Sequence, residues 1–147
     1  MSELRLQAYP DGTNLSRIAT MSANSVYGTG YEASKAADGL GNTIWHSNIT
    51  TEGNGWIAAD MGAGNEVDIS FVGITPRNDG YPVNEFTSFE LQFSDDGSSY
   101  TTAQTVTGIT GWSNGVEKTW EWGGGSPPHF AQASASTRTA AFMTFRG

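Results

Sequence analysis

One stretch of the chain combines residue types that could bind a metal ion with a residue type that could bind a ligand. Residues 34–47 read S-K-A-A-D-G-L-G-N-T-I-W-H-S, where a single acid, Asp38, lies in a Gly-rich segment that leads to a tryptophan and His46. Ca²⁺ takes about six to eight hard oxygen ligands, and carbonyls of a tight turn can supply several of them. Gly39 and Gly41 permit such a turn. The stretch therefore predicts either a turn that Asp38 caps or a loop braced by a metal ion.

Signatures of catalysis are missing from the sequence. It contains no cysteine and no G-x-S-x-G motif, and its two histidines, His46 and His129, lack the spacing of a zinc-binding H-E-x-x-H helix. Asp95 and Asp96 are neighbours in a turn-forming segment, without the apolar surroundings that tune a catalytic acid. We therefore predict that the protein is not an enzyme.

Charge and hydropathy exclude two classes of partner. The 147 residues include 15 acidic and 7 basic ones, which gives a formal net charge of −8. Nucleic acid is not expected as a partner, because binding its phosphates requires clustered Lys and Arg. Membrane insertion is not expected either, since no apolar run approaches the ~20 residues of a membrane span. The first residues also lack the apolar core of a signal peptide.

Alternation of apolar and polar residues with a period of two recurs along the chain, whereas helical periodicity does not. Phe89, Leu91 and Phe93 share one face of such a segment, as in a strand that is buried on one side. The segments with this pattern are residues 67–71, 88–93, 116–122 and 141–146, with weaker candidates at 56–61 and 100–106. Turn-forming runs separate them. The spacing predicts an all-β, antiparallel β-sandwich of the jelly-roll type.

The length predicts a single domain over residues 1–147. Within it we expect an N-terminal arm at 1–13, a sandwich formed by 14–122 and 138–147, and a long Gly/Ser/Pro loop at 123–137. One short helical turn is expected near residues 33–37. Four tryptophans that alternate with polar residues are expected in the core: Trp45, Trp56, Trp120 and Trp122.

The order of several motifs resembles the coagulation-factor type C, or discoidin, family and its galactose-binding-like relatives among carbohydrate-binding modules and fucose lectins. The motifs are N-L-S at 14–16, S-V-Y-G-T-G-Y-E-A-S-K-A-A-D-G at 25–39, T-I-W-H-S at 43–47, W-I-A-A-D-M-G at 56–62, V-G-I-T-P-R at 72–77 and F-E-L-Q-F-S-D-D-G-S-S-Y at 89–100. The resemblance covers roughly residues 14–106, and residues 141–147 are similar to the family's closing strand. It implies a discoidin-like sandwich that binds its ligand through loops at one end.

The resemblance also implies a structural calcium site. In the carbohydrate-binding members, the loop that contains D-G surrounds Ca²⁺ with two carbonyls, an Asp side chain and a Thr or Ser. These positions are Lys35, Asp38, Leu40 and Thr43 in this chain. The family usually completes the site with a glutamate in the last strand, but residues 140–147 contain no acid. We therefore expect weak Ca²⁺ binding, or a loop closed by hydrogen bonds alone.

The similarity to fucose lectins implies a sugar site. In those lectins a histidine after the calcium threonine and an R-x-D motif bind the sugar, followed by a further basic residue. The matching residues here are His46, Arg77 and Asp79, but Asn84 stands at the basic position, which argues against fucose itself. The set still suits a sugar, because Arg77 can donate to neighbouring hydroxyls, His46 can donate and accept, and a nearby polar side chain can orient both.

Aromatic side chains could provide an apolar surface for a sugar ring; the candidates are Tyr27, Tyr81 and Trp112. Trp112 lies in the turn-rich segment I-T-G-W-S-N-G and is the tryptophan expected to be exposed, although it could equally anchor its own loop. Tyr81 could simply pack on the proline that follows it. His46 could be an exposed strand residue, and Arg77 could form an ordinary surface ion pair with Asp79 or Glu85.

Two functions remain open from the sequence. The first is non-catalytic binding of a cell-surface glycan by a lectin-like module through its end loops. The second is a structural or adhesive part of a larger assembly, such as a phage-like virion fibre or decoration protein, with a homo-oligomer or virion chains as partners and the sugar site used for host attachment. In either case we expect a chain made in the cytoplasm that leaves it on a virion surface or by lysis.

Overall fold

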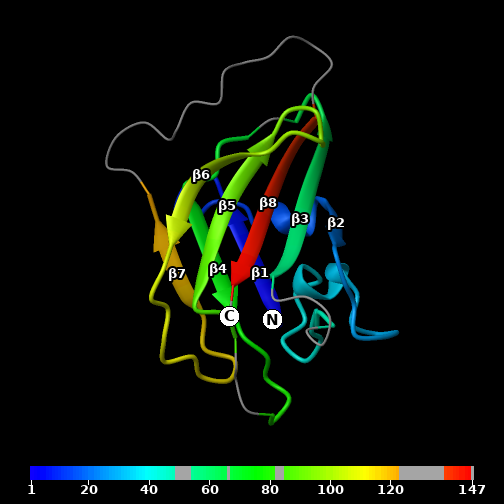
Figure 1. Ribbon diagram of the computed structural model, residues 1–147, viewed down its shortest axis with the longest axis vertical. Helices are drawn as coiled ribbons and strands as arrows, with labels where there is room; N and C mark the ends of the chain where they lie inside the picture. The colour runs from blue at the N-terminus through cyan, green and yellow to red at the C-terminus, as the bar shows by residue number, and fades with distance from the viewer. Residues whose placement is uncertain (49–53, 66, 82–84, 123–137, 147) are drawn as a thin grey trace.

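The computed structural model describes residues 1–48, 54–65, 67–81, 85–122 and 138–146. These residues form eight β-strands and two short 3₁₀ turns, η1 and η2 (Figure 1). The elements in chain order are β1 (Glu3–Gln7), η1 (Leu15–Arg17), β2 (Thr20–Ala23), η2 (Ala33–Ala36), β3 (Asn54–Ala63), β4 (Phe71–Thr75), β5 (Ser88–Ser94), β6 (Thr101–Val106), β7 (Lys118–Glu121) and β8 (Arg138–Arg146). The position of η2 confirms the helical turn expected near residues 33–37.

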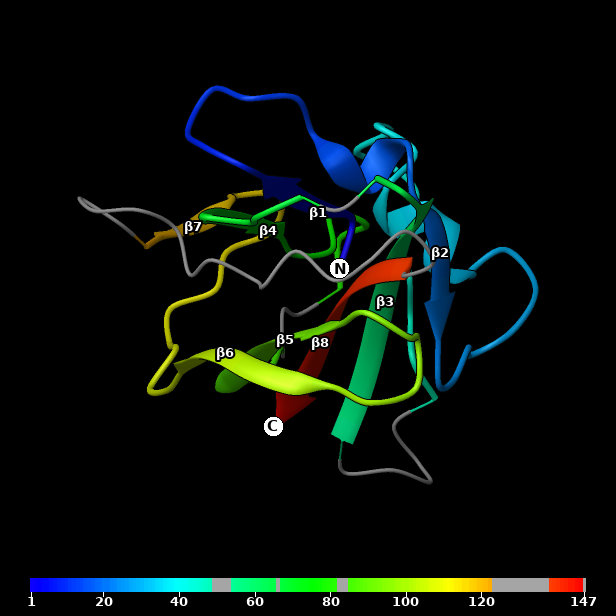
Figure 2. The same cartoon turned by 90° about the horizontal axis from the view of Figure 1, so that it is seen from above.

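The strands form two sheets that pack face to face. One sheet has the strand order β1-β4-β7, and the other has the order β2-β3-β8-β5-β6. Every recorded pairing is antiparallel. Figure 2 shows the two layers from above, and Figure 1 shows the five-stranded sheet in front of the three-stranded one. The predicted antiparallel, jelly-roll-like β-sandwich is therefore confirmed.

The core lies between the two sheets and follows the alternation seen in the sequence. Phe89, Leu91 and Phe93 of β5 are at most 4% exposed, while the residues between them point to the opposite face of the sheet. The facing sheet contributes Val72 and Ile74, which are fully buried. Burial of such side chains is worth about 1.5–3 kcal/mol each, so these two strands hold the layers together.

The N-terminal segment differs from the sequence-based expectation of an arm at residues 1–13. Residues Glu3–Gln7 form β1, which pairs antiparallel with β4 so that Leu4 lies opposite Ile74. Leu4 and Leu6 are 1% and 0% exposed. The expectation was wrong because the two leucines alternate over too few residues to predict a strand, and the pairing partner lies about seventy positions away in the chain.

One predicted strand is shorter than expected, and another is displaced along the chain. The strand predicted at 116–122 begins only at Lys118, and Val116 is 59% exposed because its N–H donates to the carbonyl of Ser113 in a turn. The strand predicted at 67–71 overlaps the observed β4 (Phe71–Thr75) only at Phe71, although Ile69 is buried as the alternation predicts. Of the four tryptophans expected in the core, Trp45 is buried, and the other three are half-buried. The loop expected at 123–137 lies outside the described residues.

Several loops meet at one end of the sandwich. The segment between β2 and β3, the segment after β4 and the loop before β7 all lie at the lower end of Figure 1, where both chain termini are also found. Within the part of the chain that the structure describes, no helix is long and apolar enough to cross a membrane. The three segments carry most of the residues that the sequence singled out for ligand binding.

Candidate functional site

The segment between β2 and β3 brings His46 together with two tyrosines. The N–H of His46 donates to the carbonyl of Tyr31 at 3.3 Å, and the carbonyl of His46 accepts from the N–H of Tyr27 at 2.7 Å. These backbone bonds place the imidazole 4.8 Å from the Tyr27 ring and 5.8 Å from the Tyr31 ring, between ring centroids. Tyr27 is 62% exposed, so the cluster presents an aromatic surface to solvent.

The segment after β4 holds Arg77 in a fixed orientation. Its Nε and Nη2 donate to the two carboxylate oxygens of Asp79 at 2.7 and 2.6 Å. The guanidinium carbon lies 5.0 Å from the centroid of the Tyr81 ring, and Tyr81 is 64% exposed. The hydrogen bond from Arg77 keeps the pKa of Asp79 below its ordinary value. The ion pair considered as an alternative is therefore present, and it positions the guanidinium while leaving Nη1 without a hydrogen bond to any described residue.

The two segments lie close enough for their charges to interact. Burial lowers the pKa of His46 below its ordinary value of 6.5, and the positive charge of Arg77 lowers it further, whereas Glu85 and Asp79 act in the opposite direction. The imidazole is consequently neutral near pH 7, with one donor and one acceptor nitrogen. We call the set of six side chains the end-loop site: Tyr27, Tyr31, His46, Arg77, Asp79 and Tyr81.

Hydrogen bonds and an ion pair of Glu85 and Met1 connect the two segments that carry the end-loop site. Glu85 Oε1 accepts from the backbone N–H of Arg77 at 3.3 Å and lies 3.2 Å from the amino group of Met1. Met1 in turn pairs with Trp45, whose N–H donates to the Met1 carbonyl at 2.9 Å. The segment that carries His46 and the segment that carries Arg77 are thus joined through Met1, just before β1, and the sequence did not predict this contact.

The loop before β7 holds the Arg77 segment from the other side. The N–H of Gly115 donates to the carbonyl of Arg77 at 3.2 Å, and Asn114 Nδ2 donates to the carbonyl of Tyr81 at 3.2 Å. Gly115 has φ of 68°, and a Cβ at that position would lie 2.9 Å from Cγ of Asn78. Sequence reasoning missed these supporting residues because their partners are 33 or more positions away and no local motif marks them.

Trp112 does not serve as the exposed platform that the sequence predicted. It is half-buried, its Nε1 donates to the carbonyl of Phe86 at 2.9 Å, and its ring centroid lies 5.1 Å from that of Phe86. The structure thus matches the alternative in which Trp112 anchors its loop. In this position the apolar surface of the indole is partly removed from water and its N–H has a hydrogen-bond acceptor. Asn84, the remaining candidate for ligand binding, lies outside the described residues.

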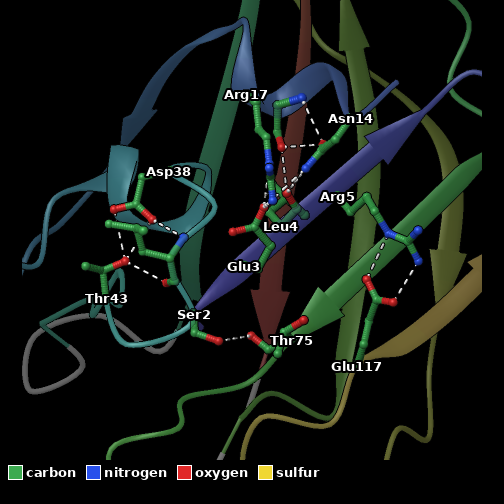
Figure 3. Close-up of polar contacts among 12 residues, drawn as sticks. Ser2, Glu3, Leu4, Arg5, Asn14, Arg17, Asp38, Thr43, Thr75 and Glu117 are labelled. Carbon is green, nitrogen blue, oxygen red and sulfur yellow. Dashed lines mark hydrogen bonds and ion pairs between the residues drawn. The ribbon is translucent and has the colours of Figure 1, made fainter. Parts of the chain in front are cut away.

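The Asp38 turn brings together three of the residues expected to bind calcium. Thr43 Oγ1 lies 2.8 and 2.9 Å from the two carboxylate oxygens of Asp38 and 2.8 Å from the carbonyl oxygen of Leu40 (Figure 3). The N–H of Leu40 also donates to Asp38 Oδ1 at 2.9 Å. A hydroxyl has one proton and can satisfy only one of three acceptors fully. Three oxygens gathered around the Thr43 hydroxyl oxygen therefore fit the ligand chemistry of a hard cation.

Positive charges near the Asp38 turn oppose strong cation binding. Lys35, the fourth expected ligand residue, has its Nζ 3.9 Å from Asp38 Oδ2. A Cβ at Gly39 would lie 2.9 Å from Cζ of Arg17, so a guanidinium packs directly against the turn. Among the described residues no group of three or more His, Cys, Asp or Glu side chains could hold a metal ion. The arrangement fits a weak calcium site and also a turn closed by hydrogen bonds.

A family model described as the F5/8 type C domain matches residues 20–125 of the chain. The fold is similar to that of CpGH89CBM32-5 from Clostridium perfringens in complex with GalNAc-β-1,3-galactose, with 23% identity, a TM-score of 0.64, and coverage of 90% of this chain and 87% of that one. It is also similar to the family 32 carbohydrate-binding module of NanJ from the same organism in complex with galactose, at 20% identity and a TM-score of 0.62, over 98% and 88% of the two chains.

A further similarity is to the C-terminal domain of a chitobiase from Bacteroides fragilis. That domain is 17% identical, with a TM-score of 0.51, and the match covers 98% of this chain and 78% of that one. At these identities the three structures support the sandwich fold and nothing more. No curated protein sequence matches the chain.

Proposed function

Because the chain belongs to the F5/8 type C domain family, we propose that it is a non-catalytic module that binds a galactose-containing glycan at the end-loop site. One observation carries the proposal. An oriented guanidinium, a neutral imidazole and exposed aromatic rings come together at the end of the sandwich from two separate chain segments. The galactose and GalNAc-β-1,3-galactose bound by the two similar Clostridium perfringens structures support this class of ligand.

Each group in the end-loop site has a defined task in this proposal. The donors of Arg77 that Asp79 does not use are directed at sugar hydroxyls or the ring oxygen, and the pairing reduces the side-chain entropy lost on binding. The neutral His46 ring donates to one hydroxyl and accepts from another. The exposed ring of Tyr27 or Tyr81 covers the apolar face of the sugar.

The carboxylates near the end-loop site do not resemble a glycosidase pair. A glycosidase requires one carboxylic acid with a raised pKa facing a second carboxylate across the bond. Asp79 has a lowered pKa because Arg77 hydrogen-bonds to it. Glu85 is engaged by the amino group of Met1 and by a backbone N–H. These contacts favour binding without catalysis, and no observation favours the alternative of a virion fibre or other assembly part.

Within the same proposal, a weakly bound Ca²⁺ braces the Asp38 turn. The residues that would hold it are Asp38, Thr43 and the carbonyl of Leu40, whose oxygens already lie together. A bound ion would neutralise the carboxylate and fix the turn that leads to His46. With a single carboxylate and Lys35 nearby, the affinity should be low.

Isothermal titration calorimetry with galactose and with GalNAc-β-1,3-galactose tests the proposed function. The wild type should bind at least one of them, and Arg77→Ala should abolish the heat of binding. Arg5→Ala is the matched control, because Arg5 pairs with Glu117 and lies between the buried Leu4 and Leu6, on the outer face of the three-stranded sheet. Absence of binding by the wild type on these ligands and on a wider glycan array would refute the proposal.

A further inference from the structure

The outer face of the five-stranded sheet contains a hollow that is separate from the end-loop site. Its volume is about 100 Å³, and the residues that line it belong to β5, β8, β6 and the segment directly after β6. The polar residues that line it are Ser88, Glu90, Thr105, Thr107, Thr144 and Arg146. None of these residues was singled out for binding by the sequence, and none belongs to the end-loop site.

Strand register explains why the polar side chains gather there. Glu90 of β5 lies opposite Thr144 of β8 on one side and opposite Thr105 of β6 on the other. Side chains directly opposite one another in antiparallel strands are about 4.5–5.5 Å apart at Cβ, so the three form a continuous row. On β3 the row continues to Trp56, which lies opposite Thr144 and is half-buried. An indole thus shares the face with the polar row.

One hydroxyl of a residue that lines the hollow has no hydrogen-bond partner among the residues that the structure describes. Thr144 Oγ1 is buried and makes no hydrogen bond within the described part of the chain. Native proteins seldom leave a buried polar atom unsatisfied, because desolvating it without a hydrogen bond is unfavourable. The oxygen is covered in this rotamer, so rotation about χ1 of Thr144 would be needed to turn it toward a ligand with hydroxyl groups in the hollow. Such a ligand could also contact the hydroxyls of Thr105 and Ser88, which line the hollow.

The charges in the hollow select the kind of ligand. Nη2 of Arg146 lies 3.5 Å from Oε1 of Glu90, so one positive and one negative group stand side by side. A phosphate or sulfate would meet the carboxylate as well as the guanidinium, and the chain as a whole has a formal net charge of −8. A neutral polyhydroxylated ring can accept from Arg146 and donate to Glu90 at the same time.

We propose that this hollow is a second saccharide site, which takes one neutral pyranose ring between Thr144, Glu90 and Arg146. The volume is well below the ~300–1,000 Å³ of pockets that enclose a drug-sized ligand, so the contact is shallow and its affinity is low. A glycan that also occupies the end-loop site would gain avidity from the second contact, provided that its length can span both.

Chemical-shift titration tests the proposal in the Arg77→Ala background, where the end-loop site is disabled. The probes are galactose, glucose, mannose and N-acetylglucosamine, each added to about 50 mM, well above the dissociation constant of a millimolar site. For at least one sugar we expect saturable shifts of the amides of Glu90, Thr105 and Thr144. Adding Thr144→Val should weaken this binding at least about fivefold, since the change removes the hydroxyl and keeps the shape.

Two further variants keep the test decisive. Thr119→Val makes the same change at an exposed position of β7 in the other sheet and should leave binding unaltered. Arg146→Gln, at a side chain that is 61% exposed, should weaken binding even if Thr144→Val fails to fold. The proposal is overturned if none of the four sugars shifts these amides, if neither variant weakens binding, or if sodium sulfate shifts the same amides and the sugars do not. Each of these results is independent of whether Arg77 binds a glycan.

Discussion

Replacing Asp38 by alanine should destabilise the protein more than removing calcium from the wild type. The carboxylate of Asp38 accepts from the N–H of Leu40 at 2.9 Å and from Thr43 Oγ1 at 2.8–2.9 Å. At about 1 kcal/mol for each hydrogen bond, the two together contribute ~2 kcal/mol. For a domain of this size that corresponds to a loss of about 4–8 °C in Tm.

Removal of calcium should have a smaller effect because a site with one carboxylate binds the ion weakly. With a dissociation constant of about 1 mM, at the weak end for calcium sites, 1 mM Ca²⁺ stabilises the folded state by only ~0.4 kcal/mol. Addition of EDTA to the wild type should therefore lower Tm by no more than about 1–2 °C.

Differential scanning calorimetry of the wild type, Asp38→Ala and Asp38→Asn, each with Ca²⁺ and with EDTA, measures the loss of Tm from the missing carboxylate and the loss from removal of calcium. Asp38→Asn keeps an acceptor for the Leu40 N–H and removes the charge, so it should lose the response to calcium but retain part of the stability. If EDTA costs the wild type as much as Asp38→Ala does, the turn is held by the ion and the hydrogen-bond argument is wrong.

Three other outcomes are expected. Arg77→Ala and His46→Ala should each lower glycan affinity in calorimetric titrations by about tenfold or more. The double variant should lose less binding free energy than the sum of the two single losses, because both residues contact one ligand. Unchanged binding by Arg77→Ala with a changed oligomeric state in light scattering would instead make Arg77 an interface residue. The pKa of His46 is lowered in the folded state, so between its ordinary value of 6.5 and that lower value the unfolded chain binds more protons. Stability measured by urea denaturation should therefore fall as pH drops through this window and be constant above it, and His46→Gln should remove that dependence. Gly115→Ala should lower the free energy of unfolding by about 1–2 kcal/mol, because Gly115 has a left-handed backbone and an added Cβ would contact Asn78. Tm and glycan affinity should fall together. Gly28→Ala, where an added Cβ would meet no atom within 4 Å, should leave both unchanged.

Features that depend on neighbouring residues could be predicted from the sequence. The alternation of Phe89, Leu91 and Phe93 determines which face of β5 is buried wherever that strand lies, because side chains of a strand alternate sides. The Asp38 turn closes within six residues, so its hydrogen bonds follow from a short motif. The Arg77–Asp79 pair was likewise predictable, because two positions separate the charges. The motif order was sufficient to indicate the family and, with it, the sandwich.

Contacts between segments far apart in the chain were decided only by the tertiary structure. Leu4 and Leu6 belong to the core because β1 pairs with β4, and Trp112 is an anchor because the carbonyl of Phe86 lies within reach of its indole. His46 and Arg77 become one site because Met1 and the Glu85 carboxylate join their segments. No local pattern encodes such pairings, since each depends on which strands become neighbours and in which register. The row of polar residues on the outer sheet face arises in the same way, from register alone, because a shift of one residue in β8 would turn Thr144 into the core.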